Sequence, residues 1–239
     1  MDHLRFKSPF CAIVAGPSGS GKTVLIRGLL QYKASLFNRP PKVILWCYGQ
    51  MQEAYNEAVP GNDIRYFEGF PSKAELTSFK PDLIVVDDLM GELSGDKELS
   101  NLFTKFSHHM NIDVIFVVQN IFHHGKEMRT ISLNSHYFIL LKNPRDKRQA
   151  MVLADQTFPG NREFFMTAYN DAISVPYGYL LLDLKPDTPD CMRVRTRLVP
   201  SETIKGLFSP ILYISDRDVR SFNEIFTCAD GNIQNQIES

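Results

Sequence analysis

A glycine-rich segment near the N-terminus, GPSGSGKT at residues 16–23, matches the pattern G-x-x-x-x-G-K-[ST]. Its glycines let successive backbone N–H groups curve around phosphate oxygens without Cβ clashes. Lys22 is placed to reach the β- and γ-phosphates, and the Thr23 hydroxyl to coordinate Mg²⁺. We therefore predict that a nucleotide binds here, with contacts from Gly16, Pro17, Ser18, Gly19, Ser20, Gly21, Lys22 and Thr23.

Two adjacent carboxylates, Asp87 and Asp88, end a later apolar run, LIVV at residues 83–86. An acidic residue at the end of a buried strand suits a magnesium ion in a phosphate site. We assign Asp87 to the magnesium-bound water and Asp88 to orienting the attacking water, because the metal then neutralises one carboxylate and leaves the other free. A pair of turn aspartates before Leu89 is the simpler alternative.

The next strongly apolar run, VIFVV at residues 114–118, ends in Gln119. An amide at that place can donate to a phosphate oxygen or hold the water, so Gln119 is our candidate for sensing the γ-phosphate. A strand end that is merely exposed to solvent is the alternative. The glycine-rich loop, the aspartate pair and this glutamine together favour hydrolysis of a nucleoside triphosphate.

Short apolar runs alternate with segments of helical spacing along most of the chain. Runs rich in β-branched residues are typical of strands that are buried on both faces of a parallel sheet. The predicted strands are Phe10–Ala15, Val43–Tyr48, Ile64–Phe67, Leu83–Val86, Val114–Val118 and Tyr137–Leu141. The predicted helices are Val24–Tyr32, Glu98–Met110, Asp146–Asp155 and Arg162–Ile173. Two later runs, Tyr179–Leu184 and Met192–Leu198, flank the turn-rich KPDTPD and predict a hairpin.

The expected fold is therefore an α/β, RecA-like P-loop NTPase of the ASCE class. Its mainly parallel sheet is flanked by helices and extended by a C-terminal β-hairpin. We place a single ATPase domain at residues 1–215 and a polar, frayed tail at residues 216–239.

Two other nucleotide chemistries compete with ATP hydrolysis. Residues 88–91 read D-x-x-G, as in switch GTPases, but that class also needs an N-K-x-D motif, and the later strands end in VVQN and LLKNPRD. A small-molecule phosphotransferase stays open, although the aspartate pair and Gln119 suit attack by water better than attack by a bound alcohol. A further alternative is a non-motor assembly adaptor that ATP binding stabilises.

The ordered set of motifs resembles the poxvirus-type genome-packaging ATPases. That family belongs to the FtsK–HerA superfamily and occurs in large DNA viruses, virophages and Polinton/Maverick elements. The motifs are GPSGSGKT, LIVVDDLM, VIFVVQN, RTISLNSHYFILLKNPRDKRQ and PYGYLLLD, and the resemblance covers roughly residues 8–200. It implies a Mg²⁺-dependent ATPase that drives double-stranded DNA into a capsid, as a ring-forming homo-oligomer with a capsid or portal protein as a further partner.

The same resemblance implies that a neighbouring subunit supplies an arginine to the γ-phosphate. That role falls on Arg129, with Arg145 and Arg148 as rivals and a solvated loop charge as the alternative. An arginine added in trans is worth roughly 10³–10⁵ in rate, and it couples hydrolysis to contact between subunits.

Two basic sets are candidates for DNA contact. Lys142, Arg145, Lys147 and Arg148 form the first, and Arg193, Arg195 and Arg197 the second. Strand alternation would put the second set on one face, although an ordinary solvent-exposed face explains it equally well. Contacts to phosphates alone would give strong salt dependence and little sequence preference.

Composition limits these possibilities. The 239 residues carry a formal net charge of −1, so any grip on DNA must come from a local patch or from many copies of one. No apolar stretch approaches the ~18 residues of a membrane helix, and no signal peptide is evident. The four cysteines show no metal-ligand spacing and are expected to be buried thiols. We therefore expect a soluble intracellular protein, located in a host cell or a virion.

Overall fold

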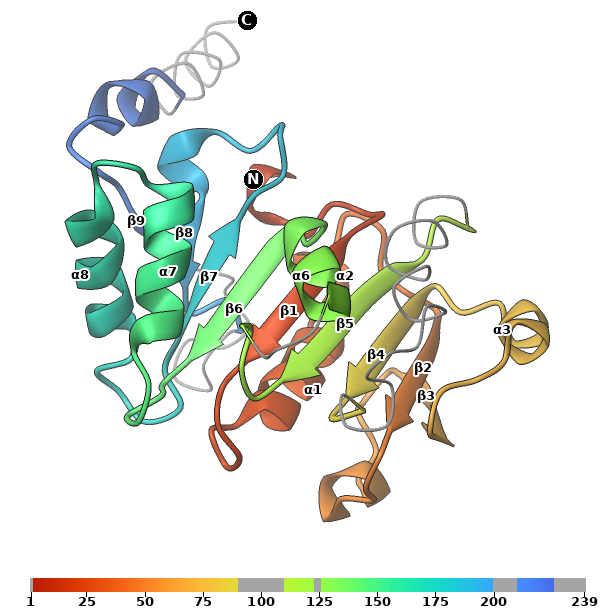
Figure 1. Ribbon diagram of the computed structural model, residues 1–239. Coiled ribbons are helices and arrows are strands. Elements are labelled where there is room, and N and C mark those ends of the chain that lie inside the picture. Colours follow the sequence, from red (N-terminus) through yellow and green to blue (C-terminus); the bar gives the residue numbers. More distant parts are fainter. Residues whose placement is uncertain (1, 90–109, 123–125, 200–209, 226–239) are drawn as a thin grey trace, which may run out of the picture.

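A computed structural model describes residues 2–89, 110–122, 126–199 and 210–225 of the chain (Figure 1). These residues contain a nine-stranded sheet in the order β3-β2-β4-β5-β1-β6-β7-β8-β9. Its strands are β1 (Cys11–Ala15), β2 (Val43–Tyr48), β3 (Asp63–Glu68), β4 (Leu83–Asp87), β5 (Asp113–Val118), β6 (Tyr137–Leu141), β7 (Tyr179–Asp183), β8 (Val194–Thr196) and β9 (Ile211–Tyr213).

The first six strands pair in parallel, from β3 at one edge to β6. Every residue of β1, β4, β5 and β6 is buried, because helices cover both faces of this part of the sheet. Side chains alternate between the two faces, so that Ile13 packs into one core cluster and Val14 into the other.

Helices divide between the two faces of the sheet (Figure 1). Ile26 and Leu36, from α1 and α2, pack into one core cluster, whereas residues of α3, α6, α7 and α8 pack into the other. The bounds are α1 (Lys22–Gln31), α2 (Lys33–Leu36), α3 (Lys73–Phe79), α6 (Lys126–Leu133), α7 (Arg148–Thr157) and α8 (Arg162–Ala172). Short 3₁₀ segments lie at η1 (Asp2–Leu4), η2 (Glu53–Asn56) and η4 (Asp190–Met192).

Strand order reverses direction at β1. The chain leaves β1 through α1 toward β2, on the side where β5 and β4 lie, but it later crosses over β1 and places β6 on the other side. Open parallel sheets bind ligands outside the carboxyl ends of their strands at such a switch point. The glycine-rich loop follows β1 directly. The residues that follow β4 and β5 lie at the same carboxyl edge of the sheet, because the three strands are parallel neighbours.

The C-terminal part of the sheet is antiparallel. β7 pairs with β6, β8 with β7 and β9 with β8, which confirms the predicted hairpin and adds one strand that the sequence did not suggest. Residues 219–225 are helical.

Most of the expected elements are present, and the α/β class with a mainly parallel sheet and an antiparallel C-terminal addition is confirmed. Cys11, Cys47 and Cys191 are buried, as expected, and Cys228 lies outside the described residues. Trp46 is buried as well. The helix predicted from residue 98 falls almost entirely on residues outside the described part of the chain. Within the described residues, the sequence-based predictions missed α2, α3, α6 and the helical residues 219–225. For α3 a signal was present, because Ser72 and Glu75 form a capping box that the S-x-x-E spacing indicates. Among the described residues, no helix has both the length and the apolar character to cross a membrane.

Candidate active site

The glycine-rich loop joins the end of β1 to the start of α1. Gly19 and Gly21 have φ angles of 75° and 94°, in the left-handed region that favours glycine. Gly21 is the N-cap of α1 and makes no side-chain capping bond, so the first N–H groups of the helix are free of a capping side chain. The Gly16 N–H donates to the carbonyl of Val118 at 3.1 Å, which ties the loop to the end of β5. This geometry suits an anion at a helix N-terminus.

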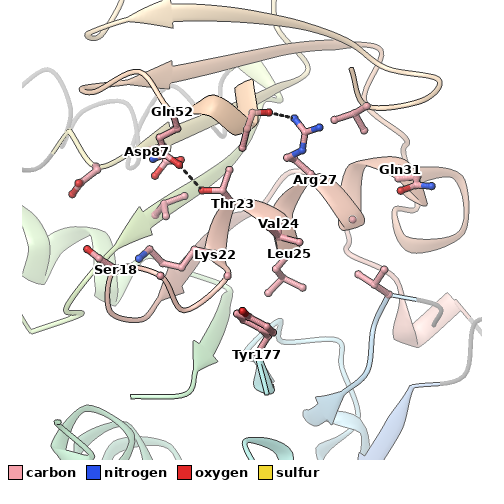
Figure 2. A pocket seen from close by; sticks show the side chains of 18 of the residues that line it. Ser18, Lys22, Thr23, Val24, Leu25, Arg27, Gln31, Gln52, Asp87 and Tyr177 are labelled. Atoms are coloured by element: carbon pink, nitrogen blue, oxygen red, sulfur yellow. Dashed lines mark hydrogen bonds between the residues drawn. The ribbon is translucent and has the colours of Figure 1, made fainter. Parts of the chain in front are cut away.

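Lys22 lies over the loop that it follows (Figure 2). Its Nζ donates to the carbonyl oxygens of Gly16 at 2.7 Å and Pro17 at 3.0 Å. Burial lowers the pKa of the Lys22 ammonium, while the nearby charges of Asp87 and Asp88 act in the opposite direction. The loop thus holds a positive charge on the edge where phosphates would lie.

Asp87 is the last residue of β4 and is only 3% exposed. Its Oδ2 accepts a hydrogen bond of 2.9 Å from the Tyr55 hydroxyl. Burial raises the pKa of the Asp87 carboxyl, and the Tyr55 bond and the Lys22 charge oppose that rise. Tyr55 belongs to η2, in the connection from β2 to β3, and no motif in the sequence indicates this role. Tyr55 therefore fixes the orientation of the carboxylate assigned to the metal.

Asp88 and Gln119 each follow directly after a neighbouring strand of the pair β4 and β5. Both side chains are exposed, and both line the cavity that contains the glycine-rich loop. Asp88 has a φ of 55°, a conformation that aspartate and asparagine tolerate better than most residues. Both residues therefore lie in the same cavity as the loop, and their roles remain predictions.

A second polar contact joins Thr23 to the β2–β3 connection. The Thr23 hydroxyl donates to Gln52 Oε1 at 3.2 Å. Four residues along α1, Arg27 donates to the carbonyl of Ala54 at 2.6 Å and to that of Glu57 at 3.0 Å. This connection thus packs along α1 beside the site, and Gln52 and Tyr55 from it contact both residues that we assign to magnesium.

A cavity of about 990 Å³ opens along this edge of the sheet. Its lining includes the loop residues Ser18, Gly19, Gly21, Lys22 and Thr23, together with Asp87, Asp88, Gln119, Gln52, Arg27 and Tyr177. Residues from the glycine-rich loop, α1, β4, β5 and the connections that carry Gln52 and Tyr177 therefore meet in one place, as Figure 2 shows for most of them.

The donor set fits a magnesium–nucleotide complex. Thr23 and Asp87 offer a hydroxyl and a carboxylate oxygen, which are the hard ligands that Mg²⁺ prefers. Among the described residues, no group of three or more His, Cys, Asp or Glu side chains could hold a metal without other ligands. Magnesium commonly binds through one or two protein groups plus substrate phosphates, so this sparse set is consistent with a metal that arrives with its nucleotide.

The first basic set lies at the same edge of the sheet. Lys142 follows β6, and Lys142, Arg145, Lys147 and Arg148 are all exposed in the connection from β6 to the start of α7. Lys147 Nζ donates to Asn170 Oδ1 at 3.3 Å and so ties this connection to α8. The set therefore forms one exposed basic segment, which we call the β6–α7 segment (residues 142–148).

The expectation that Arg193, Arg195 and Arg197 share one exposed face is wrong. Arg195 is 0% exposed, and its guanidinium bonds Asp183 Oδ2 at 2.8 Å. Arg193 is held by Asp190 at 2.6 Å, and only Arg197 is exposed. β8 spans just Val194–Thr196, so strand alternation does not extend to the outer two arginines. A buried guanidinium requires a paired carboxylate, and the pair with Asp183 joins β7 to β8.

Arg129 lies on α6 and is exposed. It does not line the cavity of its own subunit. Its role as the arginine that a neighbouring subunit receives therefore stays a prediction.

Comparison with known proteins gives a likeness at the level of fold. No family model matches the sequence, and a search of the curated proteins found no match. The genome packaging NTPase B204 from Sulfolobus turreted icosahedral virus 2, in complex with sulfate, superposes with a TM-score of 0.53 at 11% identity. That match covers 81% of this chain and 98% of B204. The same NTPase in complex with ATP-gammaS gives 0.50 at 10% identity, over 73% of this chain and 92% of that one. The chain therefore has the P-loop NTPase fold of B204.

Proposed function

We propose that this protein is a Mg²⁺-dependent ATPase that moves double-stranded DNA, as the genome-packaging motor of a virus or mobile element. The observation that carries the proposal is the convergence of the glycine-rich loop, Asp87, Asp88 and Gln119 on one cavity at the switch point of the sheet. The fold shared with B204, a genome packaging NTPase, supports the packaging role. We assign residues 1–215 to the ATPase domain and residues 216–239 to a tail.

Binding of the triphosphate follows from the loop. Its backbone N–H groups and the Lys22 ammonium would contact the phosphate oxygens. These oxygens would take the place of the Gly16 and Pro17 carbonyl oxygens as hydrogen-bond partners of Lys22. Thr23 and Asp87 would hold magnesium, which when bound neutralises charge on the phosphates. Tyr55 keeps the Asp87 carboxylate in one orientation through its hydrogen bond.

Hydrolysis requires a water aligned with the γ-phosphate. Asp88 is exposed in the cavity next to buried Asp87, so it can accept a hydrogen bond from that water. Gln119, at the end of the adjacent strand, can donate to a γ-phosphate oxygen. The site thus offers one acceptor for water, Asp88, and one donor for phosphate, Gln119. This pair favours hydrolysis over transfer to a bound alcohol.

DNA contact is assigned to the β6–α7 segment. Its four cations are exposed beside the nucleotide site, whereas the second arginine set is largely used within the fold. One such segment is a weak binder in a chain of net charge −1, but a ring of subunits would repeat it around a central duplex. A capsid or portal protein would be the further partner of such a ring.

Linear duplex DNA is expected to stimulate ATP turnover of the purified protein at low salt. The stimulation should fall steeply with salt and should not depend on sequence, because the contacts are to phosphates. The measurement is the steady-state ATPase rate with and without DNA, for wild type and for the triple variant of Lys142, Arg145 and Arg148 to alanine. Lys147 is kept because it ties the segment to α8.

A matched control removes the same charge elsewhere. Lys42, Lys73 and Lys80 are exposed around β2 and α3, away from the β6–α7 segment, and their triple alanine variant should keep the DNA stimulation. If the two triple variants lose stimulation equally, the DNA contact lies outside the β6–α7 segment. If the wild type shows no stimulation, a nucleotide switch, a phosphotransferase or a non-motor adaptor becomes the better proposal.

Replacing Arg129 with alanine is expected to reduce turnover by roughly 10³-fold or more, since an arginine donated to a neighbour's γ-phosphate contributes 10³–10⁵. When the variant is mixed with wild type, each variant subunit should inactivate a neighbouring wild-type site in its ring. The ATPase activity of the mixture should therefore fall faster than the wild-type fraction. Arg162→Ala, which changes another exposed arginine, should keep wild-type turnover, so its mixing curve should stay level at every ratio. A straight line for Arg129→Ala would exclude it as the arginine in trans and would direct the same test to Arg145 and Arg148.

A further inference from the structure

An unusual turn precedes β7. The Gly178 N–H donates to the Val175 carbonyl at 3.1 Å, so residues 175–178 form a turn with Pro176 and Tyr177 at its centre. Tyr177 has a φ of 57°, in the left-handed region where glycine or asparagine is expected and a bulky aromatic residue is strained. Strained residues of this kind persist where the surrounding structure fixes them, and they are concentrated at ligand sites.

The turn is held in place from two sides. A Cβ at Gly178 would lie 2.3 Å from the Ala172 carbonyl oxygen and 2.9 Å from the Ile173 Cα, so the backbone at 178 packs directly against the end of α8. The Gly178 carbonyl accepts from the Lys142 N–H at 3.2 Å, which joins the turn to the end of β6. The position of the Tyr177 ring is thus set by the fold and does not depend on a free loop.

The ring lies against the glycine-rich loop. A Cβ at Gly21 would approach the Tyr177 Cδ1 to 3.0 Å, so the ring already contacts the last glycine before Lys22. Tyr177 nevertheless is 69% exposed, and Val24 on the first turn of α1 is 71% exposed. Figure 2 shows Tyr177 beside the start of α1, close to Val24 and Leu25, with Gln52 on the opposite side of the helix.

These two exposed apolar side chains line the same cavity as the phosphate loop, on the side of α1 away from Asp87 and Gln52. The phosphates occupy the loop, so a nucleoside attached to them must leave along one side of the first turn of α1. The β2–β3 connection covers one side through Gln52 and Arg27. The Tyr177 side offers an apolar surface of a size that suits a planar base.

We propose that Tyr177 is the stacking platform for the nucleotide base, with Val24 as the neighbouring apolar contact. The proposal rests on the proposed function, because it places the base of the nucleotide whose phosphates the loop binds. Stacking uses the face of the base and not its hydrogen-bonding edge, so Tyr177 supplies affinity for purine nucleotides without selecting one of them. The strained backbone at Tyr177 thus holds its ring beside the loop.

The test compares a ligand that has a base with one that has none. Full-length wild type, Tyr177→Ala and Tyr177→Phe are titrated with a non-hydrolysable ATP analogue and with inorganic triphosphate, each with Mg²⁺, by calorimetry. Tyr177→Ala should bind the analogue roughly 5- to 150-fold more weakly, the range that loss of one aromatic–base stack produces. It should bind inorganic triphosphate as wild type does, and Tyr177→Phe should bind both normally.

Tyr177→Gly separates the ligand effect from a folding effect, because glycine suits a φ of 57°. This variant should unfold at a temperature no lower than wild type and yet lose affinity for the analogue as Tyr177→Ala does. Equal losses for both ligands, or no loss for either, would overturn the stacking proposal while leaving the ATPase proposal intact. If wild type binds neither ligand, the proposed function fails and the stacking site fails with it.

Discussion

Lys22→Ala is expected to lower ATP turnover by at least roughly 10²–10³-fold, the cost of removing one preorganised group that stabilises charge in the transition state. The Gly16 and Pro17 carbonyls hold the Lys22 ammonium over the loop, and burial lowers its pKa. Because phosphates beside it would stabilise the charged ammonium, they would form strong charge-assisted hydrogen bonds with it. The measurement is the ATPase rate together with the affinity for a non-hydrolysable ATP analogue, and both should fall.

The matched control is Lys33→Ala. Lys33 begins α2, directly after α1, and it does not line the cavity, so its loss should leave turnover within about twofold of wild type. Thermal unfolding of both variants without nucleotide checks that each is folded. If a folded Lys22→Ala protein hydrolyses ATP at the wild-type rate, the glycine-rich loop is not the catalytic phosphate site.

The second large effect is expected from Asp88→Asn. It should reduce turnover by roughly 10²–10⁴-fold, the contribution of a positioned group that accepts a proton from water, while Mg²⁺–nucleotide binding should stay near the wild-type value. Asparagine keeps the size of the side chain and tolerates the φ of 55° at this position, so the change removes charge without disturbing the backbone. Single-turnover hydrolysis and equilibrium titration with an ATP analogue measure the two quantities.

Asp87→Asn provides the contrast. Asp87 is buried and bonded to Tyr55, and we assign it to magnesium, so this variant should lose Mg²⁺-dependent affinity as well as turnover. Titration of the analogue with and without Mg²⁺ distinguishes the two aspartates. A larger loss of binding in Asp88→Asn than in Asp87→Asn would mean that the two roles are exchanged.

Sequence patterns were sufficient to predict the strands that carry these residues. A parallel strand covered on both faces must be apolar at every position, so the runs at β1, β4, β5 and β6 stand out against their polar connections. The first charged or amide residue after such a run lies at the carboxyl edge of the sheet. Asp87, Asp88 and Gln119 could therefore be located without any knowledge of how the strands pair.

The residues that support the site were not predictable in this way. Gln52 and Tyr55 come from a connection with no periodic pattern, and their contacts with Thr23 and Asp87 join positions about 30 residues apart in the chain. Tyr177 lies far beyond the loop in sequence, and only the crossover that places β6 and β7 on the open side of β1 brings the two together. Side-chain contacts of this kind depend on strand order.

For Arg195, a clear sequence pattern led to a wrong prediction of exposure. Alternating arginines suggested an exposed basic face, but the Arg195 side chain is buried between Asp183 and the N-terminal segment, and its guanidinium donates to the His3 carbonyl at 3.1 Å. Which face of a strand is solvated depends on what packs against it, and charge pattern alone does not encode that.

The sequence by itself determined the phosphate loop, the acidic and amide strand ends and the α/β class, because backbone freedom, metal preference and burial act on short local stretches. The tertiary structure alone decided which of these residues share one cavity, that Tyr55 and Gln52 contact the two residues that we assign to magnesium, and that Tyr177 lies against Gly21. The physical reason is that strand order is set by packing across the whole sheet, and only that order converts separate strand ends into a single site.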